Sequence, residues 1–387
     1  MIVTRRVAII GGGASAILLL AHLARRSDCR QFSIDIYDRA GAFGRGVAYG
    51  TDGKSHLLNV RAGNMSALAH EPSDFLAYAA PLGYTPSDFV PRRIYVDYLK
   101  TKIAQAQEKI SVRFIQEDVL FCRKTEGGYV LKTPLSEITY DIAVQATGNV
   151  SPLRPAVKPG AARYHDSPWI VNYAALSAVK HIILLGSGLS AVDVVSSLYH
   201  AGYTGKISVM SRHGLFPAVH VMPEIYPSFI DGAAYPDPLE LLRLLKHHVR
   251  EAGVPWQAVV DSIRPHTNDI WRSWDNAQRD IFMKRLLTFW NVHRHRMAPE
   301  VADILKTFDI EMIHDRAMTV DTDGAVIGGH GTYQSDAVIN CLGYRYTETG
   351  RIFDTPFKIG PARFGELFET TAIPEIRAQA DEMARVI

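Results

Sequence analysis

The chain has 387 residues, 47% of them hydrophobic and 21% charged, and its formal net charge is +2. This length predicts two domains, and the composition allows each of them a full apolar core. The small net charge gives no reason to expect nucleic acid or an anionic membrane as a partner, and no apolar run is long enough to span a bilayer.

The first predicted element is a buried parallel strand, because residues 7–10 form a continuous apolar run. A turn with G-x-G-x-x-A spacing follows, and it opens a helical pattern over 17–24. Glycine permits the tight turn and lets the backbone approach a pyrophosphate, while the small last residue lets the helix pack close to the strand. We therefore expect a dinucleotide to contact Gly11, Gly13, Ala14, Ser15 and Ala16.

A second predicted strand, 32–37, ends at Asp38, which lies about 20 residues beyond the glycines, where a ribose-binding carboxylate is expected. An acid at this position accepts hydrogen bonds from both ribose hydroxyls and repels a 2′-phosphate. Asp38 therefore favours FAD over a phosphorylated dinucleotide, and we include Arg39 beside it among the cofactor-binding candidates.

The stretch after Asp38 is crowded with glycines, namely Gly41, Gly44, Gly46 and Gly50. Such a density suits backbone that passes close to a large flat ligand, and a mobile surface loop is the alternative. The candidates for ligand contact here are Gly46, Val47 and Ala48. Further on, a strand over 142–145 leads into the small-residue turn Ala146-Thr147-Gly148, which would let the chain cross close to the bound cofactor.

A second glycine fingerprint follows another buried strand, 182–185, and precedes an apolar helix over 192–198. After the next strand, 206–210, the position that matches Asp38 carries no carboxylate. An arginine stands there instead, as expected where a 2′-phosphate must be bound. Alternatively, Arg212 is a solvent-exposed residue at the end of the strand without a role in binding. The NADPH-binding candidates are Gly186, Ser187, Gly188, Ser190, Ala191, Ser211 and Arg212.

One FAD-like and one NADPH-like fingerprint in the same chain imply electron flow from nicotinamide to flavin. The sequence resembles the two-dinucleotide-binding-domain flavoproteins, and more narrowly a bacterial FAD/NAD(P)-binding family that includes FAD-dependent urate hydroxylases. The stretches that carry this resemblance run in order along the chain: 11–16, 46–49, 58–60, 64–66, 91–95, 146–149, 186–191, 211–214, 290–296, 340–343 and 369–377.

The resemblance implies further cofactor-binding residues outside the two fingerprints, namely Asn59, Val60, Met65, Ser66, Val119 and Gly360. The layout also resembles class B flavin monooxygenases, in which a short motif with a histidine and an aromatic residue precedes the second fingerprint. Residues 164–169 occupy that position here, without the motif's glycine. The interval between 346 and 357 is shorter than in the relatives. Because it is expected near the substrate side of the flavin, we do not carry over the family's substrates.

We expect an α/β fold with two Rossmann-like dinucleotide-binding domains. A discontinuous FAD domain would comprise 1–160 and 344–387 and close with a helix over 374–384, and an NADPH domain would comprise 161–343. Within the second domain, a helical insertion of about 222–307 contains helical patterns over 238–252 and 277–296. Its tryptophans, Trp256, Trp271, Trp274 and Trp290, would cover the substrate pocket or form a structural layer.

No metal site is expected. His293 and His295 lie two residues apart and so point in different directions on a helix, and a basic helix C-terminus explains the run 293–296 better. The cysteines, Cys29, Cys122 and Cys341, form no CxxC pair. A disulfide framework and a redox dithiol therefore lack support, and a reducing cytoplasm fits.

The leading functional hypothesis is a monooxygenase that uses oxygen to hydroxylate a small molecule, with nitrogen-containing compounds as one candidate class, through a flavin hydroperoxide. Asn59 and His165 are the catalytic candidates, although His165 could equally be a satisfied linker histidine. The first alternative is an NADPH-dependent flavin reductase or a flavin oxidase without oxygen insertion. The second is a flavoprotein with a sensing role. The sequence predicts neither the substrate nor the oligomeric state.

Overall fold

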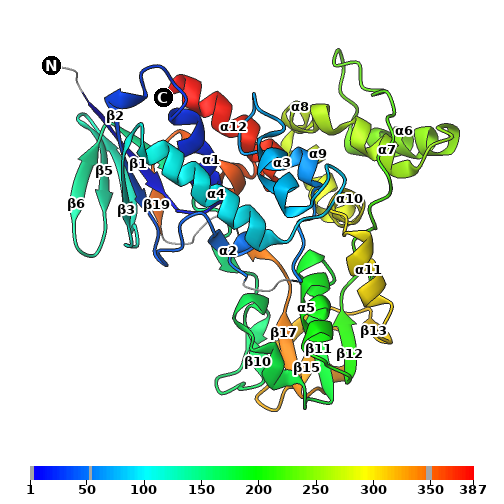
Figure 1. Cartoon of the computed structure of the whole chain (residues 1–387). Helices are drawn as coiled ribbons and strands as arrows, with labels where there is room; N and C mark the ends of the chain where they lie inside the picture. The colour runs from blue at the N-terminus through cyan, green and yellow to red at the C-terminus, as the bar shows by residue number, and fades with distance from the viewer. Residues whose placement is uncertain (1–3, 52–54, 346–350) are drawn as a thin grey trace. The chain divides into compact units, whose positions relative to one another are not determined.

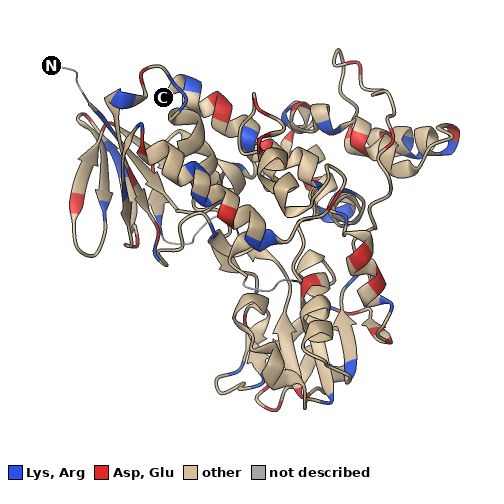
Figure 2. Cartoon of the chain, in the orientation of Figure 1, with Lys and Arg blue, Asp and Glu red and all other residues tan. Residues whose placement is uncertain are grey.

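The computed structural model describes residues 4–51, 55–345 and 351–387. The chain forms two compact units (Figure 1). Unit 1 comprises the residues up to Ser151 together with those from Tyr344 onward, and unit 2 runs from Pro152 to Gly343. In both units Lys and Arg are interspersed with Asp and Glu (Figure 2). Within the described part of the chain, no helix is long and apolar enough to cross a membrane.

Unit 1 is built on a parallel sheet with the strand order β20-β7-β1-β2-β3. These strands are Phe357–Lys358, Ile142–Gln145, Arg5–Ile10, Phe32–Tyr37 and Ser111–Ile115, respectively. The four apolar residues of β1 are almost fully buried, as expected for a strand covered on both faces.

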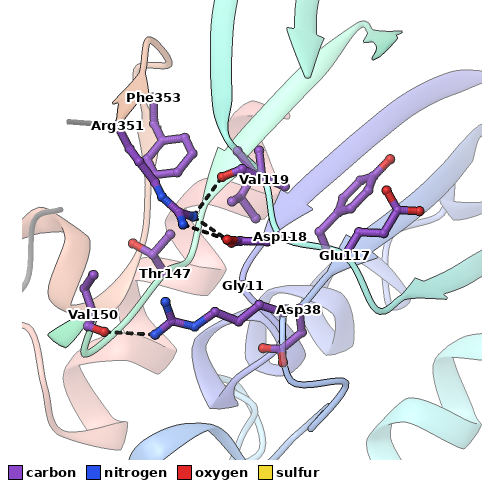
Figure 3. Close-up of a pocket in the computed structure, with 12 residues that line it drawn as sticks. Gly11, Asp38, Glu117, Asp118, Val119, Thr147, Val150, Arg351 and Phe353 are labelled. Carbon is purple, nitrogen blue, oxygen red and sulfur yellow. Dashed lines mark hydrogen bonds and ion pairs between the residues drawn. The ribbon is translucent and has the colours of Figure 1, made fainter. Parts of the chain in front are cut away.

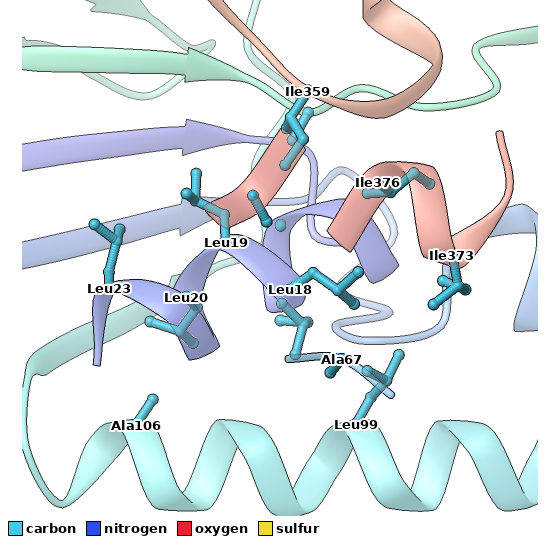
Figure 4. Packing of buried hydrophobic residues seen from close by; sticks show 14 of the residues in the cluster. Leu18, Leu19, Leu20, Leu23, Ala67, Leu99, Ala106, Ile359, Ile373 and Ile376 are labelled. Carbon is cyan, nitrogen blue, oxygen red and sulfur yellow. The ribbon is translucent and has the colours of Figure 1, made fainter. Parts of the chain in front are cut away.

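Helix α1 (Ala14–Leu23) packs against α4 (Arg92–Gln107) and α12 (Ile373–Val386). Nearly every residue of α1 is buried, because its leucines face helices as well as the sheet (Figure 4). The two smaller helices of unit 1 are α2 (Gly46–Tyr49) and α3 (Asp74–Ala79).

A second sheet of unit 1 has the order β19-β4-β5-β6, and β4 to β6 form an antiparallel meander. The strands are Ile352–Phe353, Phe121–Thr125, Gly128–Lys132 and Glu137–Tyr140. Strand β19 comes from the C-terminal part of the chain and lies parallel to β4. The C-terminal segment therefore contributes to both sheets of unit 1, through β19 and β20.

Unit 2 repeats the parallel arrangement with the order β10-β17-β11-β12-β13. These strands are Tyr164–His165, Ala337–Asn340, His181–Leu185, Lys206–Met210 and Ile310–Ile313, and α5 (Leu189–His200) packs against α11 (Pro299–Leu305). A smaller sheet holds β16 (Thr332–Tyr333), β15 (Val326–Gly328), β14 (Ala317–Val320) and β9 (Ala156–Val157). A separate two-stranded ribbon pairs β8 (Ser151–Pro152) with β18 (Tyr344–Arg345), and all of its residues except Pro152 belong to unit 1.

Residues 222–307 contain helices and irregular chain but no strand, and this whole stretch is described. The helices besides α11 are α6 (Pro238–Glu251), α7 (Trp256–Ser262), α8 (Thr267–Ser273), α9 (Asn276–Ile281) and α10 (Leu287–Arg294). The single helix expected over 277–296 is instead α9, a π-helical turn (Phe282–Leu286) and α10. It ends at Arg294 because His295 leaves the helical conformation, with φ −97° and ψ 76°.

Three of the four tryptophans of the insertion form one aromatic cluster with Phe282. Trp271, Trp274 and Trp290 are buried, and the ring centroid of Phe282 lies 5.2 Å from that of Trp274 and 6.4 Å from that of Trp290. The indole of Trp274 donates a 2.8 Å hydrogen bond to the carbonyl of Pro236. This packing favours the structural reading of the cluster.

The α/β class with two Rossmann-like units is confirmed. The assignment of FAD to one domain and NADPH to the other, with the boundaries given above, remains a prediction.

Candidate cofactor-binding sites

The first glycine turn lies between the carboxyl ends of β1, β2 and β7. Gly11 has φ +104°, and a Cβ on it would lie 2.3 Å from the carbonyl oxygen of Ala146. The Gly11 amide donates a 2.8 Å hydrogen bond to the carbonyl of Tyr37. Only glycine fits this contact, so the small-residue turn at 146–148 crosses directly against the fingerprint, as the sequence predicts.

Helix α1 begins at this turn with Gly13 as its N-cap and no side-chain hydrogen bond to the cap. A helix start of this kind can bind an anion such as a pyrophosphate through its first amides. Two other predicted residues lie against it. A Cβ on Gly46 would lie 3.3 Å from the Cα of Gly13, and a Cβ on Gly360 would lie 2.4 Å from the Oγ of Ser15. The glycine-rich stretch after Asp38 thus includes the short helix α2, which is packed at the start of α1.

Asp38 is held by backbone amides. Its Oδ2 accepts a hydrogen bond from Gly12 at 3.0 Å, and its Oδ1 accepts from Ala40 at 2.9 Å and from Ala42 at 3.3 Å. A carboxylate has about four acceptor positions, so these bonds leave room for about one ribose hydroxyl. The assignment of Asp38 to both ribose hydroxyls stays a prediction.

A pocket opens beside Asp38 (Figure 3). Five of its lining residues were predicted from the sequence: Gly11, Asp38, Arg39, Val119 and Thr147. Arg39 donates a 3.0 Å hydrogen bond to the carbonyl of Val150, which is another lining residue. Sequence reasoning missed the rest of the lining: Ile10, Tyr37, Glu117, Asp118, Val150, Arg351 and Phe353.

Two of the missed residues lie at the end of the shortened interval after Tyr346. That interval was expected near the substrate side of the flavin. Residues 346–350 lie outside the described residues, but Arg351 and Phe353 line the same pocket as Gly11 and Asp38. The described end of the interval therefore lies beside Asp38, and the expected place of 346–350 near the substrate stays a prediction.

The residues that the family resemblance added between α2 and α3 do not line this pocket. Met65 and Ser66 are buried, and Asn59 and Val60 are half-buried. The carbonyl of Ser66 accepts a 3.2 Å hydrogen bond from Arg377 on α12. Their assignment to the cofactor, like that of Val47 and Ala48, stays a prediction.

Several buried polar atoms of unit 1 have no hydrogen-bond partner within the described residues. They include Glu117 Oε2 in the pocket, and Gln379 Nε2, whose own Oε1 accepts a 2.9 Å bond from the amide of Gly360. Unsatisfied buried polar atoms are costly.

The second glycine turn repeats the first one within unit 2. Gly186 has φ +98°, and a Cβ on it would lie 2.7 Å from the carbonyl oxygen of Cys341. Its amide bonds the carbonyl of Met210 at 2.8 Å. Gly188 is the N-cap of α5, again with no side-chain cap, and the buried Ala191 lets α5 pack closely.

The loop after β12 corresponds to the position of Asp38 in unit 1, but it carries no carboxylate there. The Oγ of Ser187 lies 2.9 Å from the Oγ of Ser211 and 2.7 Å from the carbonyl oxygen of Leu215, which ties this loop to the glycine turn. Arg212 is exposed, and in the described part of the chain its side chain has neither an ion pair nor a hydrogen bond. Its guanidinium can therefore bind a phosphate without giving up a protein partner.

The two catalytic candidates belong to different units, with Asn59 in unit 1 and His165 in unit 2. His165 lies on β10 and pairs with Ile339 of β17. Burial lowers the pKa of His165, so we expect a neutral imidazole at pH 7.

The cysteines do not form a redox pair. All three are free; Cys122 and Cys341 are buried, and burial raises the pKa of the Cys122 thiol to about 11. Such thiols are unreactive at neutral pH. Over the described ranges, no cluster of three or more His, Cys, Asp or Glu side chains could hold a metal ion.

Comparisons with known proteins bear on the type of domain and on the fold. A family model described as FAD-NAD(P)-binding matches residues 8–150. No curated protein sequence matches the chain significantly. Several solved structures, in contrast, match it over almost its whole length.

An ornithine hydroxylase from Pseudomonas aeruginosa aligns with a TM-score of 0.62 at 16% identity, covering 99% of this chain and 98% of that one. An ornithine N-hydroxylase from Kutzneria sp. 744, solved with reduced FAD, NADP+ and L-ornithine, gives 0.61 at 12% identity with the same coverage. A bacillithiol disulfide reductase from Staphylococcus aureus gives 0.55 at 13% identity, also covering 99% and 98%. At these identities the likeness shows the fold alone.

Residues 8–150 are thus an FAD/NAD(P)-binding domain. The whole chain has the fold of the two-dinucleotide-domain flavoproteins, to which both hydroxylases and disulfide reductases belong. The narrower resemblance to a family with urate hydroxylases remains a prediction.

Proposed function

We propose that this protein is an FAD-containing oxidoreductase that NADPH reduces, and that it acts as a monooxygenase on a small molecule. One observation carries the cofactor assignment. Two glycine turns with the same geometry, at Gly11 and Gly186, are followed by different residues at the end of the next strand. The first site has a carboxylate held by backbone amides, and the second has an unpaired arginine.

The residues of unit 1 fit FAD. The start of α1, with Gly13, Gly46 and Gly360 close by, offers backbone without intervening side chains for a pyrophosphate. Asp38 lines the pocket and can accept a ribose hydroxyl there. The pocket therefore suits an uncharged adenosine and disfavours a 2′-phosphate.

The residues of unit 2 fit NADPH. Ser187 and Ser211 hold the loop after β12 against the glycine turn, and Arg212 offers a guanidinium to the 2′-phosphate. An arginine–phosphate contact is charge-assisted and can be bidentate. NADH lacks this phosphate, so the site should discriminate between the two coenzymes.

The monooxygenase proposal is supported by the hydroxylases that share the fold and by the isolated cysteines. Bound FAD supplies the redox chemistry and the reaction with oxygen. The balanced reaction consumes substrate, O2, NADPH and a proton, and it yields hydroxylated substrate, water and NADP+. An amine is the first substrate class to test, because the fold neighbours include ornithine hydroxylases. The free cysteines agree with a reducing cytoplasm as the compartment.

The second candidate function is an NADPH-dependent reductase or an oxidase without oxygen insertion. The disulfide reductase with the same fold keeps this class open. Chemistry that needs a dithiol is disfavoured, because the chain has no CxxC pair and two of its three cysteines are buried. A sensing flavoprotein would not need the complete second fingerprint.

The deciding experiment reduces the protein anaerobically with NADPH, mixes it with oxygen and follows the flavin absorbance. A transient spectrum that differs from both oxidised and reduced flavin is expected of a monooxygenase. Direct return to the oxidised spectrum, together with stoichiometric hydrogen peroxide in the presence of amines, would assign the protein to the oxidase or reductase class.

A further inference from the structure

The C-terminal segment brings two side chains into the pocket beside Asp38. Strand β19 pairs with β4, with Ile352 opposite Phe121 and Phe353 opposite Cys122. Neighbouring residues of an extended chain point to opposite sides. Accordingly, Arg351 and Phe353 both line the pocket, whereas Ile352 between them is 57% exposed.

The guanidinium of Arg351 is fixed by contacts along its edge. Its Nη1 and Nη2 bond the two carboxylate oxygens of Asp118, each at 2.6 Å, and Nη1 also donates to the carbonyl of Val119 at 3.0 Å (Figure 3). A bidentate pair sets the plane of the guanidinium. Its flat faces are then the surfaces suited to stacking on a ring.

The charges around the pocket favour a neutral, hydrogen-bonding ring system over a phosphate. The lining holds three carboxylates, those of Asp38, Glu117 and Asp118, against the two guanidinium groups of Arg39 and Arg351. Asp38 accepts three backbone amides and keeps about one acceptor position, which takes a hydrogen-bond donor. Adenosine offers such donors in its amino group and its ribose hydroxyls, together with a flat base.

We propose that Arg351 and Phe353 form an adenine clamp, and that this clamp makes the protein select FAD over FMN. The inference rests on the proposed flavin function and adds the residues that determine which flavin is bound. A base stacked on an aromatic side chain is worth about 1–3 kcal/mol, which corresponds to about five- to hundredfold in affinity, and an arginine adds a cation–π contribution. FMN has no adenosine and cannot use the clamp.

The test compares the affinities of the apoprotein for FAD and for FMN, measured by quenching of flavin fluorescence. Arg351→Met and Phe353→Leu should each weaken FAD binding by about five- to hundredfold and leave FMN binding unchanged. Lys358→Met is the matched control, because it removes a 2.8 Å ion pair to Glu366 on the same C-terminal segment, outside the pocket lining. This control should change neither affinity.

The outcomes separate the clamp from the proposed function. Unchanged FAD affinity in both pocket variants would overturn the clamp. An equal loss of affinity for FAD and FMN would also overturn it, because it would show that Arg351 and Phe353 stabilise the fold. Wild-type protein that binds neither flavin would overturn the proposed function itself. Thermal unfolding of the apoprotein variants serves as a folding check. If Arg351→Met has lost its fold, Arg351→Lys takes its place. Lysine keeps the positive charge but has no planar guanidinium, so this variant should still weaken FAD binding and leave FMN binding unchanged.

Discussion

Arg212→Ala is the substitution that tests most sharply how the second site reads its coenzyme. The side chain is exposed at the end of β12 and has no partner among the residues that the structure describes, so its removal should leave stability almost unchanged, within about 0.5 kcal/mol. A hydrogen bond to a charged group contributes about 1.5–3 kcal/mol. NADPH affinity should therefore fall by about ten- to a hundredfold.

The assay is anaerobic stopped-flow reduction of the flavin at increasing NADPH and NADH concentrations, which gives an apparent Kd for each coenzyme. Arg212→Ala should raise the Kd for NADPH alone, so that the variant no longer distinguishes the two coenzymes. Lys306→Ala is a charge control, since this lysine is exposed in the same unit, directly after α11, and forms an ion pair with Asp303 of that helix. An equal loss for NADPH and NADH, or no loss for either, would refute the assignment of Arg212 to the 2′-phosphate.

Three further predictions follow from the packing. Gly11→Ala should abolish FAD retention, measured as flavin per protein after gel filtration, because the new Cβ would lie 2.3 Å from the Ala146 carbonyl oxygen. Trp274→Ala should lower the free energy of unfolding, measured by chemical denaturation, by about 3–5 kcal/mol. Unchanged stability with more hydrogen peroxide formed per NADPH would instead favour the insertion as a cover of the substrate pocket. Burial lowers the pKa of His22 below 6.5, and its ring accepts a hydrogen bond from the Ala69 amide. Below pH 6.5 the unfolded chain therefore binds more protons than the folded one, and acidification destabilises the wild type. The Tm of His22→Gln should fall less steeply with decreasing pH than the Tm of the wild type.

The regular part of the fold could be predicted from local sequence. Strands β2, β7 and β12 have the bounds that their apolar runs indicate, and the glycines at both turns occupy positions that only glycine fits. These features depend on neighbours in the chain. The antiparallel meander β4 to β6 has no comparable motif and was not predicted.

The pocket was only half predictable, for a physical reason. Glu117 and Asp118 lie in the connection between β3 and β4, while Arg351 and Phe353 reach the pocket through the pairing of β19 with β4. More than two hundred residues separate Asp118 from Arg351 in the sequence, and no local pattern marks such a contact. A charged residue one position before a short apolar strand looks, in sequence, like any solvated strand end.

The most direct test of the central claim is the flavin content of the purified protein together with its anaerobic response to NADPH. The protein should be yellow and should release FAD on denaturation. NADPH should bleach the flavin absorbance at lower concentration than NADH does. Released FMN, no flavin after reconstitution with FAD, or a bound flavin that NADPH fails to reduce would contradict the assignment.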